Sequence, residues 1–327
     1  MALQKVPGRA IQLDSQVSSD IMYHNGTDWV RLAKGEAGQV LVVNDAGTFP
    51  QWGTSDWVYR GSIRGFSMGG ANHYGGGGTG VWYFYSDIYS HEFATDGNAV
   101  DTTGDLVAAN HGCSGFSSET HSFVAGGAQS QNVIQSFQNT NPGGNATDLA
   151  DLTTNHPRIT PVSSLTHGYG VSGAGANIEK FAFANTANAT LVGNLSNSHT
   201  GTHGGGATDS TNDYGYAAGG FPNTNVIDRF SFVNETTTDD VGDLVLTSGQ
   251  ASGCSSETHG YFIGPGNPSR VQRYAFASSG NATQVATLSS NGTARGNGIS
   301  SQTHGYLVGG EVHFTQIDKF SFANETT

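Results

Sequence analysis

The amino-acid sequence predicts an all-β fold, a six-bladed β-propeller with four strands in each blade. A strand-like phrase, Ile-x-x-Phe-x-Phe or a close variant, returns six times at a spacing near 46 residues, beginning at Ile88, Ile134, Ile178, Ile227, Val271 and Ile317. A second marker keeps the same register, because an asparagine follows each copy, at Asn98, Asn145, Asn188, Asn234, Asn281 and Asn324. The chain also has 48 glycines in 327 residues and only 12% charged residues, as expected of many short strands joined by tight turns. A period of this length in a glycine-rich β sequence is typical of propeller blades.

Each repeat divides into four strand-sized pieces, and the fifth repeat shows them most clearly. A Ser/Gly-rich stretch at 246–256 is followed by strand-like residues 258–264 and 271–276 and by polar residues 282–288. The second piece recurs in every repeat and usually ends in a glycine pair, where positive φ or a close backbone approach is expected. We therefore predict an N-terminal attachment segment at 1–48 and a propeller at 49–327, with repeats at about 49–106, 107–152, 153–195, 196–244, 245–288 and 289–327.

The sixth repeat raises the question of ring closure. Because the sequence reaches Thr327 just after the third strand of this repeat, we expect the sixth blade to lack its fourth strand. The apolar run Gln39–Val43 lies just upstream of the predicted start of the ring near Phe49. This run is a candidate to complete the blade and cover its open edge. It is equally a candidate to pair within a trimer.

Three elements of the repeat carry a resemblance. The second strand reads Arg- or His-Gly-aromatic-x-x-Gly-Gly, the third reads Asn-x-Ile-x-x-aromatic, and the turn into the fourth reads Gly-Asn-Ala-Thr-x-x-Gly-Asp-Leu. The leucine that ends this pattern stands at Leu106, Leu152, Leu195, Leu244 and Leu288. Over about residues 50–327 the pattern resembles the Kelch-like repeats found in bacteriophage virion proteins, which implies a virion structural protein.

The N-terminal segment carries a second and more specific resemblance. It is similar to a module of phage tail-fibre proteins, on the pattern formed here by Asn25, Gly26, Trp29, Leu32, Gly35, Gly38, Gln39, Val40, Leu41 and Trp52. In that family the module lies near the attachment end and is commonly trimeric. The resemblance implies synthesis in the host cytoplasm and a place in the virion as a tail fibre or another surface appendage. It also implies contact with other virion proteins through this segment and a homo-oligomer, with a trimer favoured.

Composition disfavours several classes of partner. A net charge of −13 repels phosphate backbones, so nucleic-acid binding is not expected. The N-terminus lacks the apolar core of a signal peptide and no run approaches about 18 apolar residues, so we expect neither export by such a signal nor membrane insertion. Cys113 and Cys254 fall in the second and fifth repeats, on opposite sides of a six-membered ring. We therefore expect two unpaired thiols.

No residue pattern selects a catalytic reaction. His121, His167, His259 and His304 recur with the blade, so we interpret them as structural contacts between blades and not as metal ligands. Aspartates gather at the turn into the fourth strand, where turn formation is favoured over the alternative, calcium binding. Neither a unique pair of carboxylates nor a Gly-x-Ser-x-Gly motif stands out. We expect no metal, no cofactor and no enzymatic activity, with a polysaccharide-degrading propeller enzyme as an alternative.

The two places where the repeat is interrupted are the best candidates for binding, because irregular loops on a repeat scaffold tend to carry function. The candidate ligand-binding residues are His73, Tyr74, Trp82, Tyr83, Tyr85, His199, His203 and Asp209. Aromatic side chains stack on sugar faces, although such an aromatic run also packs well inside a blade. We predict a receptor-binding protein that binds a host-surface glycan or receptor. The alternative is a non-catalytic capsid, neck or baseplate decoration or adaptor protein.

Overall fold

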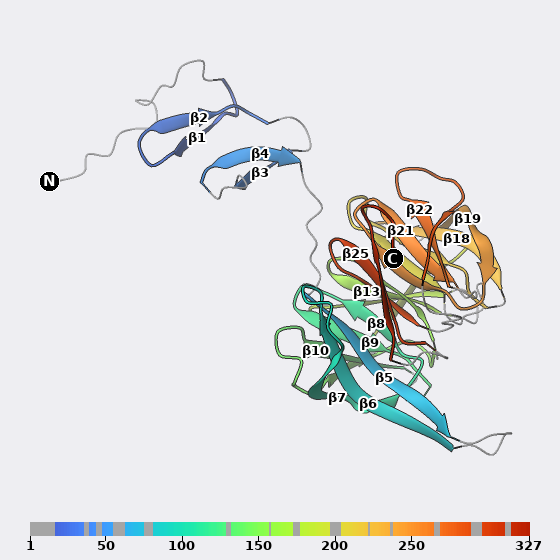
Figure 1. The fold of residues 1–327 in the computed structure, drawn as a ribbon. Helices are drawn as coiled ribbons and strands as arrows, with labels where there is room; N and C mark the ends of the chain where they lie inside the picture. The colour runs from blue at the N-terminus through green and yellow to red at the C-terminus, as the bar shows by residue number, and fades with distance from the viewer. Residues whose placement is uncertain are drawn as a thin grey trace. The chain divides into compact units, whose positions relative to one another are not determined.

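The structure is a computed structural model, and every regular element in the part of the chain that it describes is a strand, which confirms the all-β prediction (Figure 1). No helix in this part is long and apolar enough to cross a membrane. The chain divides into two compact units, Met1–Val58 and Tyr59–Thr327. The described residues are 17–35, 39–43, 48–54, 63–74, 81–128, 132–156, 158–172, 177–196, 204–221, 223–235, 238–264, 269–288, 296–310 and 315–327.

The first unit contains two hairpins. β1 (Ile21–His24) pairs with β2 (Trp29–Leu32), and β3 (Gln39–Val43) pairs with β4 (Pro50–Thr54). Among the described residues β3 pairs with β4 in a two-stranded sheet and β26 pairs only with β25, so the expected completion of the sixth blade by this run is not found there. A partner a few residues away costs less loop-closure entropy than one at the far end of the chain.

Residues of the fibre-like pattern form one turn of this unit and a link between its hairpins. The side-chain oxygen of Asn25 accepts a hydrogen bond from the backbone N–H of Asp28 at 2.8 Å, and Gly26 has a positive φ of 102°. The indole N–H of Trp52 donates to the carbonyl oxygen of Ala33. The Asn-Gly and Trp positions of the pattern therefore have structural roles, as turn former and anchor.

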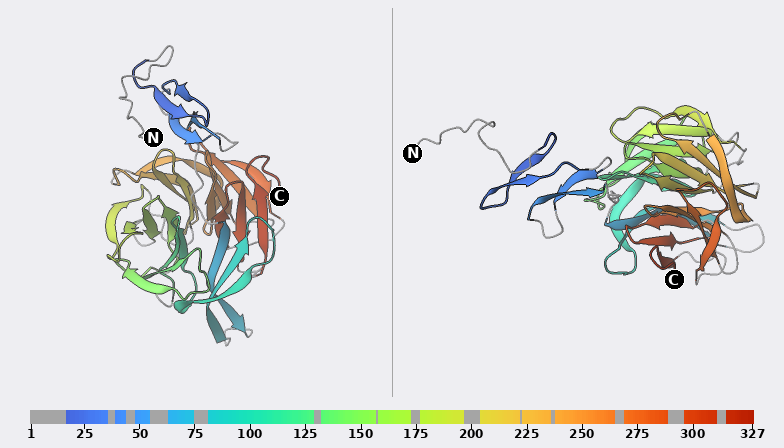
Figure 2. Two further views of the ribbon diagram at one scale, coloured as in Figure 1. Left: turned by 90° about the vertical axis from the view of Figure 1, so that its left-hand side faces the viewer. Right: turned by 90° about the horizontal axis from the view of Figure 1, so that it is seen from above.

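The second unit is a six-bladed propeller, as predicted (Figure 2). The first blade consists of β5 (Arg64–Tyr74), β6 (Val81–Glu92) and β7 (Val100–Asn110). Four complete blades follow: β8 (Ser114–Ser117), β9 (His121–Ala125), β10 (Val133–Gln138) and β11 (Thr147–Asp151); β12 (Thr160–Ser163), β13 (His167–Ser172), β14 (Asn177–Ala182) and β15 (Thr190–Asn194); β16 (Gly205–Asp209), β17 (Tyr214–Ala218), β18 (Thr224–Ser231) and β19 (Thr238–Ser248); and β20 (Ser252–Ser255), β21 (His259–Gly264), β22 (Arg270–Ala275) and β23 (Thr283–Thr287). The sixth blade consists of β24 (Asn297–Ser300), β25 (His304–Val308) and β26 (Ile317–Ser321), and within the described ranges no fourth strand pairs with β26.

The first strands of neighbouring blades lie against one another around the propeller axis. Their Ser/Gly-rich sequences fit this close approach, because a Cβ on Gly253 would lie 2.1 Å from the carbonyl oxygen of Gly206. Serine side chains link the strands across the blades. Ser255 Oγ accepts a hydrogen bond from the backbone N–H of Thr208 at 2.8 Å, and Ser300 Oγ accepts one from the N–H of Ser255 at 2.9 Å. Small residues in the first strand are therefore a requirement of the ring itself.

The recurring aromatic residues pack one blade on the next. The ring of Phe230, in a third strand, covers Gly215 in the second strand, where an added Cβ would lie 2.5 Å from the ring. Tyr169 of the preceding blade lies 5.6 Å from Phe230 and stacks on Phe232 at 4.8 Å. The His-Gly-aromatic phrase thus supplies the ring of one blade, and the Phe-x-Phe phrase supplies the rings of the next blade on which it packs. Aromatic pairs at this distance stabilise a packed interface.

The asparagine markers hold neighbouring blades together. The side-chain oxygen of Asn188 accepts a hydrogen bond from the backbone N–H of Asp151 at 3.1 Å, and the N–H of Ala189 donates to the carbonyl oxygen of Asp151 at 2.8 Å. The same two bonds recur where Asn145 and Ala146 meet Asp105 and where Asn281 and Ala282 meet Asp243. The asparagine therefore pairs with the outermost strand of the preceding blade at these three junctions.

The antiparallel order of the strands sorts their connections onto two faces of the ring. We call one the loop face: it carries the connections between second and third strands and those between successive blades. The opposite turn face carries the turns between first and second strands and between third and fourth strands. The inserted segments of the first and fourth repeats connect β5 to β6 and β15 to β16, so the strands that flank them end on the loop face.

Candidate functional site

The four repeated histidines lie at the start of second strands, on the turn face. Each ring Nδ1 lies 2.7–2.9 Å from the hydroxyl of the threonine before it, at Thr120–His121, Thr166–His167, Thr258–His259 and Thr303–His304. The hydroxyl partner belongs to the same turn, and the expected contact of these histidines with a neighbouring blade stays a prediction. Burial lowers the pKa of His167, His259 and His304 and so favours the neutral ring. Among the described residues, no three His, Cys, Asp or Glu side chains form a group able to hold a metal ion.

The first blade carries the most prominent feature of the loop face, a long hairpin. β5 and β6 have 11 and 12 residues and extend beyond the neighbouring blades (Figure 1). Trp82 and Tyr83, at the loop-face end of β6, are 54% and 53% exposed. Two large aromatic side chains are thus presented to solvent on regular strand backbone.

A histidine from the connection to the second blade lies against this hairpin. The ring of His111 is nearly parallel to Phe84 at 4.8 Å and to Trp82 at 6.3 Å, with an angle of 14° in both cases. The buried side chain of Asn110 accepts a hydrogen bond from the N–H of His111 at 2.8 Å and donates to the carbonyl oxygen of Gly126 at 2.9 Å. Trp82 and Phe84 therefore pack against the ring of His111, and the side chain of Asn110 links the backbone of His111 to the second blade. Sequence reasoning missed His111, because only the fold brings it to β6.

The remaining candidates of the first repeat lie on the same hairpin. The phenol oxygen of Tyr85 accepts a hydrogen bond from Asn72 Nδ2 at 3.1 Å, which ties β5 to β6 through side chains. His73 and Tyr74 pair with Trp82 and Val81 through the backbone, and their side chains lie outside the described part. The structure thus brings Trp82, Tyr83 and Tyr85 onto one hairpin, with the backbone of His73 and Tyr74 on its other strand.

Of the candidates of the fourth repeat, only Asp209 lies in the described part of the chain, and it does not join this group. His199 and His203 lie outside the described residues. Asp209 is at the end of β16 on the turn face, and its side chain is buried. Its carboxylate accepts hydrogen bonds from the N–H groups of Thr211 and Asn212, both at 3.1 Å, and from Asn212 Nδ2 at 2.8 Å. Asp209 therefore caps its own turn and lies on the face opposite the hairpin.

A buried carboxylate in the third blade contacts a buried histidine in the connection from the second blade to the third. His156 Nε2 is 2.9 Å from Glu179 Oε1 and 2.5 Å from Thr154 Oγ1, and the N–H and hydroxyl of Thr153 donate to Glu179 at 2.9 and 2.6 Å. Burial alone would raise the pKa of Glu179, but the hydrogen bonds from His156 and Thr153 outweigh it and lower the pKa. Both the hydroxyl and the carboxylate reach the same ring nitrogen, whereas a proton relay through a histidine needs its two nitrogens to have separate partners. This group therefore fixes the connection between two blades.

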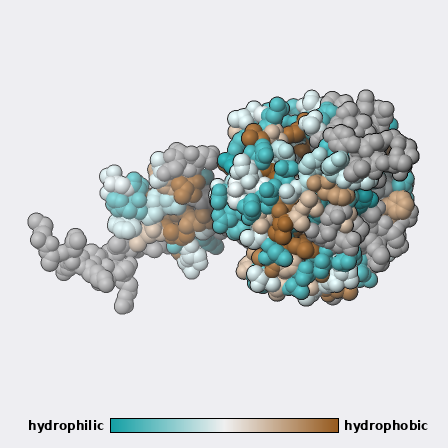
Figure 3. Space-filling model, turned by 90° about the horizontal axis from the view of Figure 1, so that it is seen from below, coloured by the Kyte–Doolittle hydropathy of each residue, from teal (hydrophilic) through white to brown (hydrophobic). Residues whose placement is uncertain are grey.

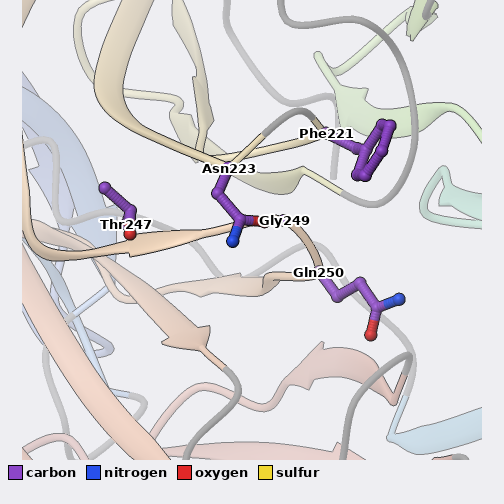
Figure 4. Close-up of a pocket in the computed structure, with 5 residues that line it drawn as sticks. All are labelled: Phe221, Asn223, Thr247, Gly249 and Gln250. Carbon is purple, nitrogen blue, oxygen red and sulfur yellow. The ribbon is translucent and has the colours of Figure 1, made fainter.

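A pocket of about 220 Å³ opens on the same loop face in the fourth blade, lined by Phe221, Asn223, Thr247, Gly249 and Gln250 (Figure 4). Sequence reasoning missed it, although one signal was present. Phe221 follows the glycine pair of its repeat, where Ala71, Ala128 and Glu311 follow the corresponding pairs. A large apolar residue at a position that is alanine or glutamate in these other repeats indicates that Phe221 has a role specific to the fourth blade.

Comparison with known proteins shows no family for this chain. No known protein family matches the chain, and no curated protein matches it. Among solved structures, 537 chains match it. One is a fungal alcohol oxidase of the AA5 family in complex with copper, at 14% sequence identity and a TM-score of 0.49, and the alignment covers 73% of this chain and 57% of that chain. The chain thus spans little more than half the length of that oxidase. The class of protein that the structure itself shows is a six-bladed β-propeller.

Proposed function

We propose that this protein is a bacteriophage virion component, a tail fibre or receptor-binding protein, whose propeller binds a glycan on the host surface through the hairpin of the first blade. The observation that carries the proposal is the exposure of Trp82 and Tyr83 at the end of a long hairpin. The C–H groups of a sugar ring are weakly positive and lie well on the negative face of an aromatic ring. Because Trp82 and Tyr83 are consecutive residues of β6, their side chains lie on opposite faces of the hairpin, and each offers a separate aromatic surface.

The contacts that hold the hairpin in place favour ligand binding with little loss of conformational entropy. Strand pairing holds the backbone of Trp82 and Tyr83, and His111 lies beside Trp82. Side chains that are already ordered lose little conformational entropy when a ligand binds. The space-filling view shows several hydrophobic patches that alternate with hydrophilic side chains on the surface, so hydropathy alone does not distinguish a binding site (Figure 3).

The separate N-terminal unit supports the virion part of the proposal. Two hairpins form a small compact unit before the propeller, and the residues that resemble the phage-fibre module supply its turn at Asn25 and its link at Trp52. In this proposal the N-terminal unit contacts other virion proteins, within a trimer, and leaves the propeller to bind the host.

The test is binding of the purified chain to an array of bacterial capsular polysaccharides and O-antigens. The matched control is Val233→Ala, which removes a 72% exposed apolar side chain on the turn face. We expect at least one polysaccharide to bind, Trp82→Ala/Tyr83→Ala to weaken this binding by about tenfold or more, and Val233→Ala to leave it unchanged. Binding that survives the loss of both aromatics contradicts the site. Release of reducing sugar would identify an enzyme, and attachment to virion proteins without any glycan binding would identify an adaptor.

A further inference from the structure

We propose that the pocket beside Phe221 is a second carbohydrate site, which takes one uncharged sugar ring. The proposal rests on the proposed function for its class of ligand, but the pocket shares no residue with the first-blade hairpin. The pocket lies between the connection from β17 to β18 and the connection from β19 to β20. In Figure 4 the Asn223 amide lies between Thr247 on one side and Phe221 and Gln250 on the other.

The backbone fixes the walls of this pocket. The N–H of Gly219 donates to the carbonyl oxygen of Val226 at 3.2 Å, and the N–H of Gly220 donates to that of Ser248 at 2.6 Å. The second bond joins the two connections that form the pocket, and the side chain of Ser248 at this junction is buried. The site is therefore held by paired backbone and does not depend on a free loop.

Gly249 sets the position of the Asn223 amide. A Cβ on Gly249 would lie 2.1 Å from Asn223 Oδ1, so no other residue fits at 249 while Asn223 keeps its place. The amide of Asn223 thus lies close against the backbone at the pocket wall. Substitution of Gly249 would displace a proposed ligand group without removing it.

The lining matches a neutral sugar. Phe221 is 58% exposed and offers an aromatic face, while Asn223, Gln250 and Thr247 offer amide and hydroxyl groups that both donate and accept hydrogen bonds. None of the five lining residues is charged, and the chain has a net charge of −13, which disfavours an acidic sugar. A volume near 220 Å³ is below the range of about 300–1,000 Å³ that is usual for drug-sized ligands, which favours a single ring.

The two sites lie in the first and fourth blades, three blades apart in a ring of six, and both open on the loop face. A chain-like polysaccharide that engages both would gain avidity over either contact alone. The pocket would then select polysaccharides that contain a particular neutral sugar, because hydrogen bonds from its amides to sugar hydroxyl groups depend on direction as well as distance.

The experiment follows backbone amide NMR shifts of the whole chain during titration with glucose, galactose, rhamnose, N-acetylglucosamine and N-acetylgalactosamine, with glucuronic acid as the charged comparison. We expect at least one neutral sugar to shift the amides of Gly249 and Gln250. Phe221→Ala should weaken this binding about tenfold or more. Gly249→Ala should weaken it through the displaced Asn223, while Val233→Ala on the turn face leaves it unchanged.

The outcomes separate this pocket from the proposed function. No shift with any neutral sugar, shifts that persist in Phe221→Ala, or stronger binding of glucuronic acid would each overturn the pocket. Circular dichroism and the thermal midpoint show whether a variant remains folded, and Phe221→Ala removes an exposed side chain, so its fold is expected to survive. Failure of polysaccharides to bind the Trp82 hairpin, together with specific shifts at Gly249, would reject the hairpin site and leave the pocket standing.

Discussion

Lys319 and Asp96 close the propeller ring, although 223 residues separate them in the sequence. Lys319 Nζ, in β26, donates to both carboxylate oxygens of Asp96, just after β6, at 2.7 and 2.8 Å. Beside them Tyr306 of the sixth blade stacks on Phe93 of the first at 5.1 Å. Two internal junctions use an equivalent ion pair, Lys180 with Glu235 at 2.5 Å and Arg273 with Glu325 at 2.7 Å. In the described residues the ring is therefore closed by the same kind of blade contact that is used inside it.

The Lys319–Asp96 pair should contribute to stability in a salt-dependent way. Both side chains are partly exposed, so the coupling free energy from a double-mutant cycle of Lys319→Met and Asp96→Asn should be about 0.2–1 kcal/mol. Chemical denaturation at low ionic strength measures it. The coupling should shrink in about 1 M salt, where the screening length falls to about 3 Å. A coupling of zero at low salt would show that the pair does not hold the ring.

His91 should make the closing junction sensitive to acid. It takes the place in the first blade that Phe137, Phe181, Phe230, Tyr274 and Phe320 take in the others. Its side chain is 4% exposed and lies 5.4 Å from the ring of Tyr306, and among the described residues its Nε2 has no hydrogen-bond partner. We expect His91→Phe to raise the free energy of unfolding near neutral pH by about 1–3 kcal/mol, the cost of a buried unsatisfied polar group.

The pH dependence gives His91→Phe a second readout. Burial lowers the pKa of His91, against the opposing charges of Asp96 and Glu92. For a lowered histidine pKa, the stabilisation is complete above the unfolded pKa of about 6.5 and is lost as the pH falls through the folded pKa. The advantage of His91→Phe should therefore grow as the pH is lowered from about 7 to about 5. A difference that stays constant over this window would contradict a buried neutral His91.

The glycine of the His-Gly-aromatic phrase should not tolerate a methyl group. A Cβ on Gly168 would lie 2.4 Å from the ring of Phe181, so Gly168→Ala should lower the free energy of unfolding by about 1–3 kcal/mol through overpacking. Gly280→Ala is the matched control, because a Cβ there meets nothing within 4 Å. Denaturation midpoints of the two variants decide the matter. Equal midpoints would mean that the Phe181 ring moves aside freely.

The asparagine contact between blades should also be measurable. Asn188→Ala removes the acceptor for the N–H of Asp151 and should cost about 1 kcal/mol of unfolding free energy. Asn324→Ala is the comparison, since the Asn324 side chain is exposed and bonds only within its own turn, to Thr326, among the described contacts. Amide hydrogen exchange at Asp151 should accelerate in Asn188→Ala. Unchanged exchange there would show that the asparagine is a turn former and nothing more.

Much of the fold could be predicted because the same contacts recur in every blade. The residues at Ile134, Ile178 and Ile227 are fully buried, and periodic apolar positions of this kind are visible in a sequence. The partner of Gln39–Val43 could not be predicted, since the run suits either β4 or an open blade edge. The candidate site was predicted at Trp82 and Tyr83, where the repeat is interrupted, but His111 and the pocket at Asn223 and Gly249 were not.

The sequence by itself determined the number of blades, the order of strands within each blade, and the glycine, phenylalanine and asparagine positions that join them. These features depend on short-range pattern repeated at a constant spacing. Only the tertiary structure decided that Lys319 meets Asp96, that His111 lies against Trp82, and that Asp209 caps a turn on the opposite face. The physical reason is that the first two contacts join residues of different repeats, whose meeting depends on how the ring closes, and that the face on which Asp209 lies depends on the direction of its strand in the sheet.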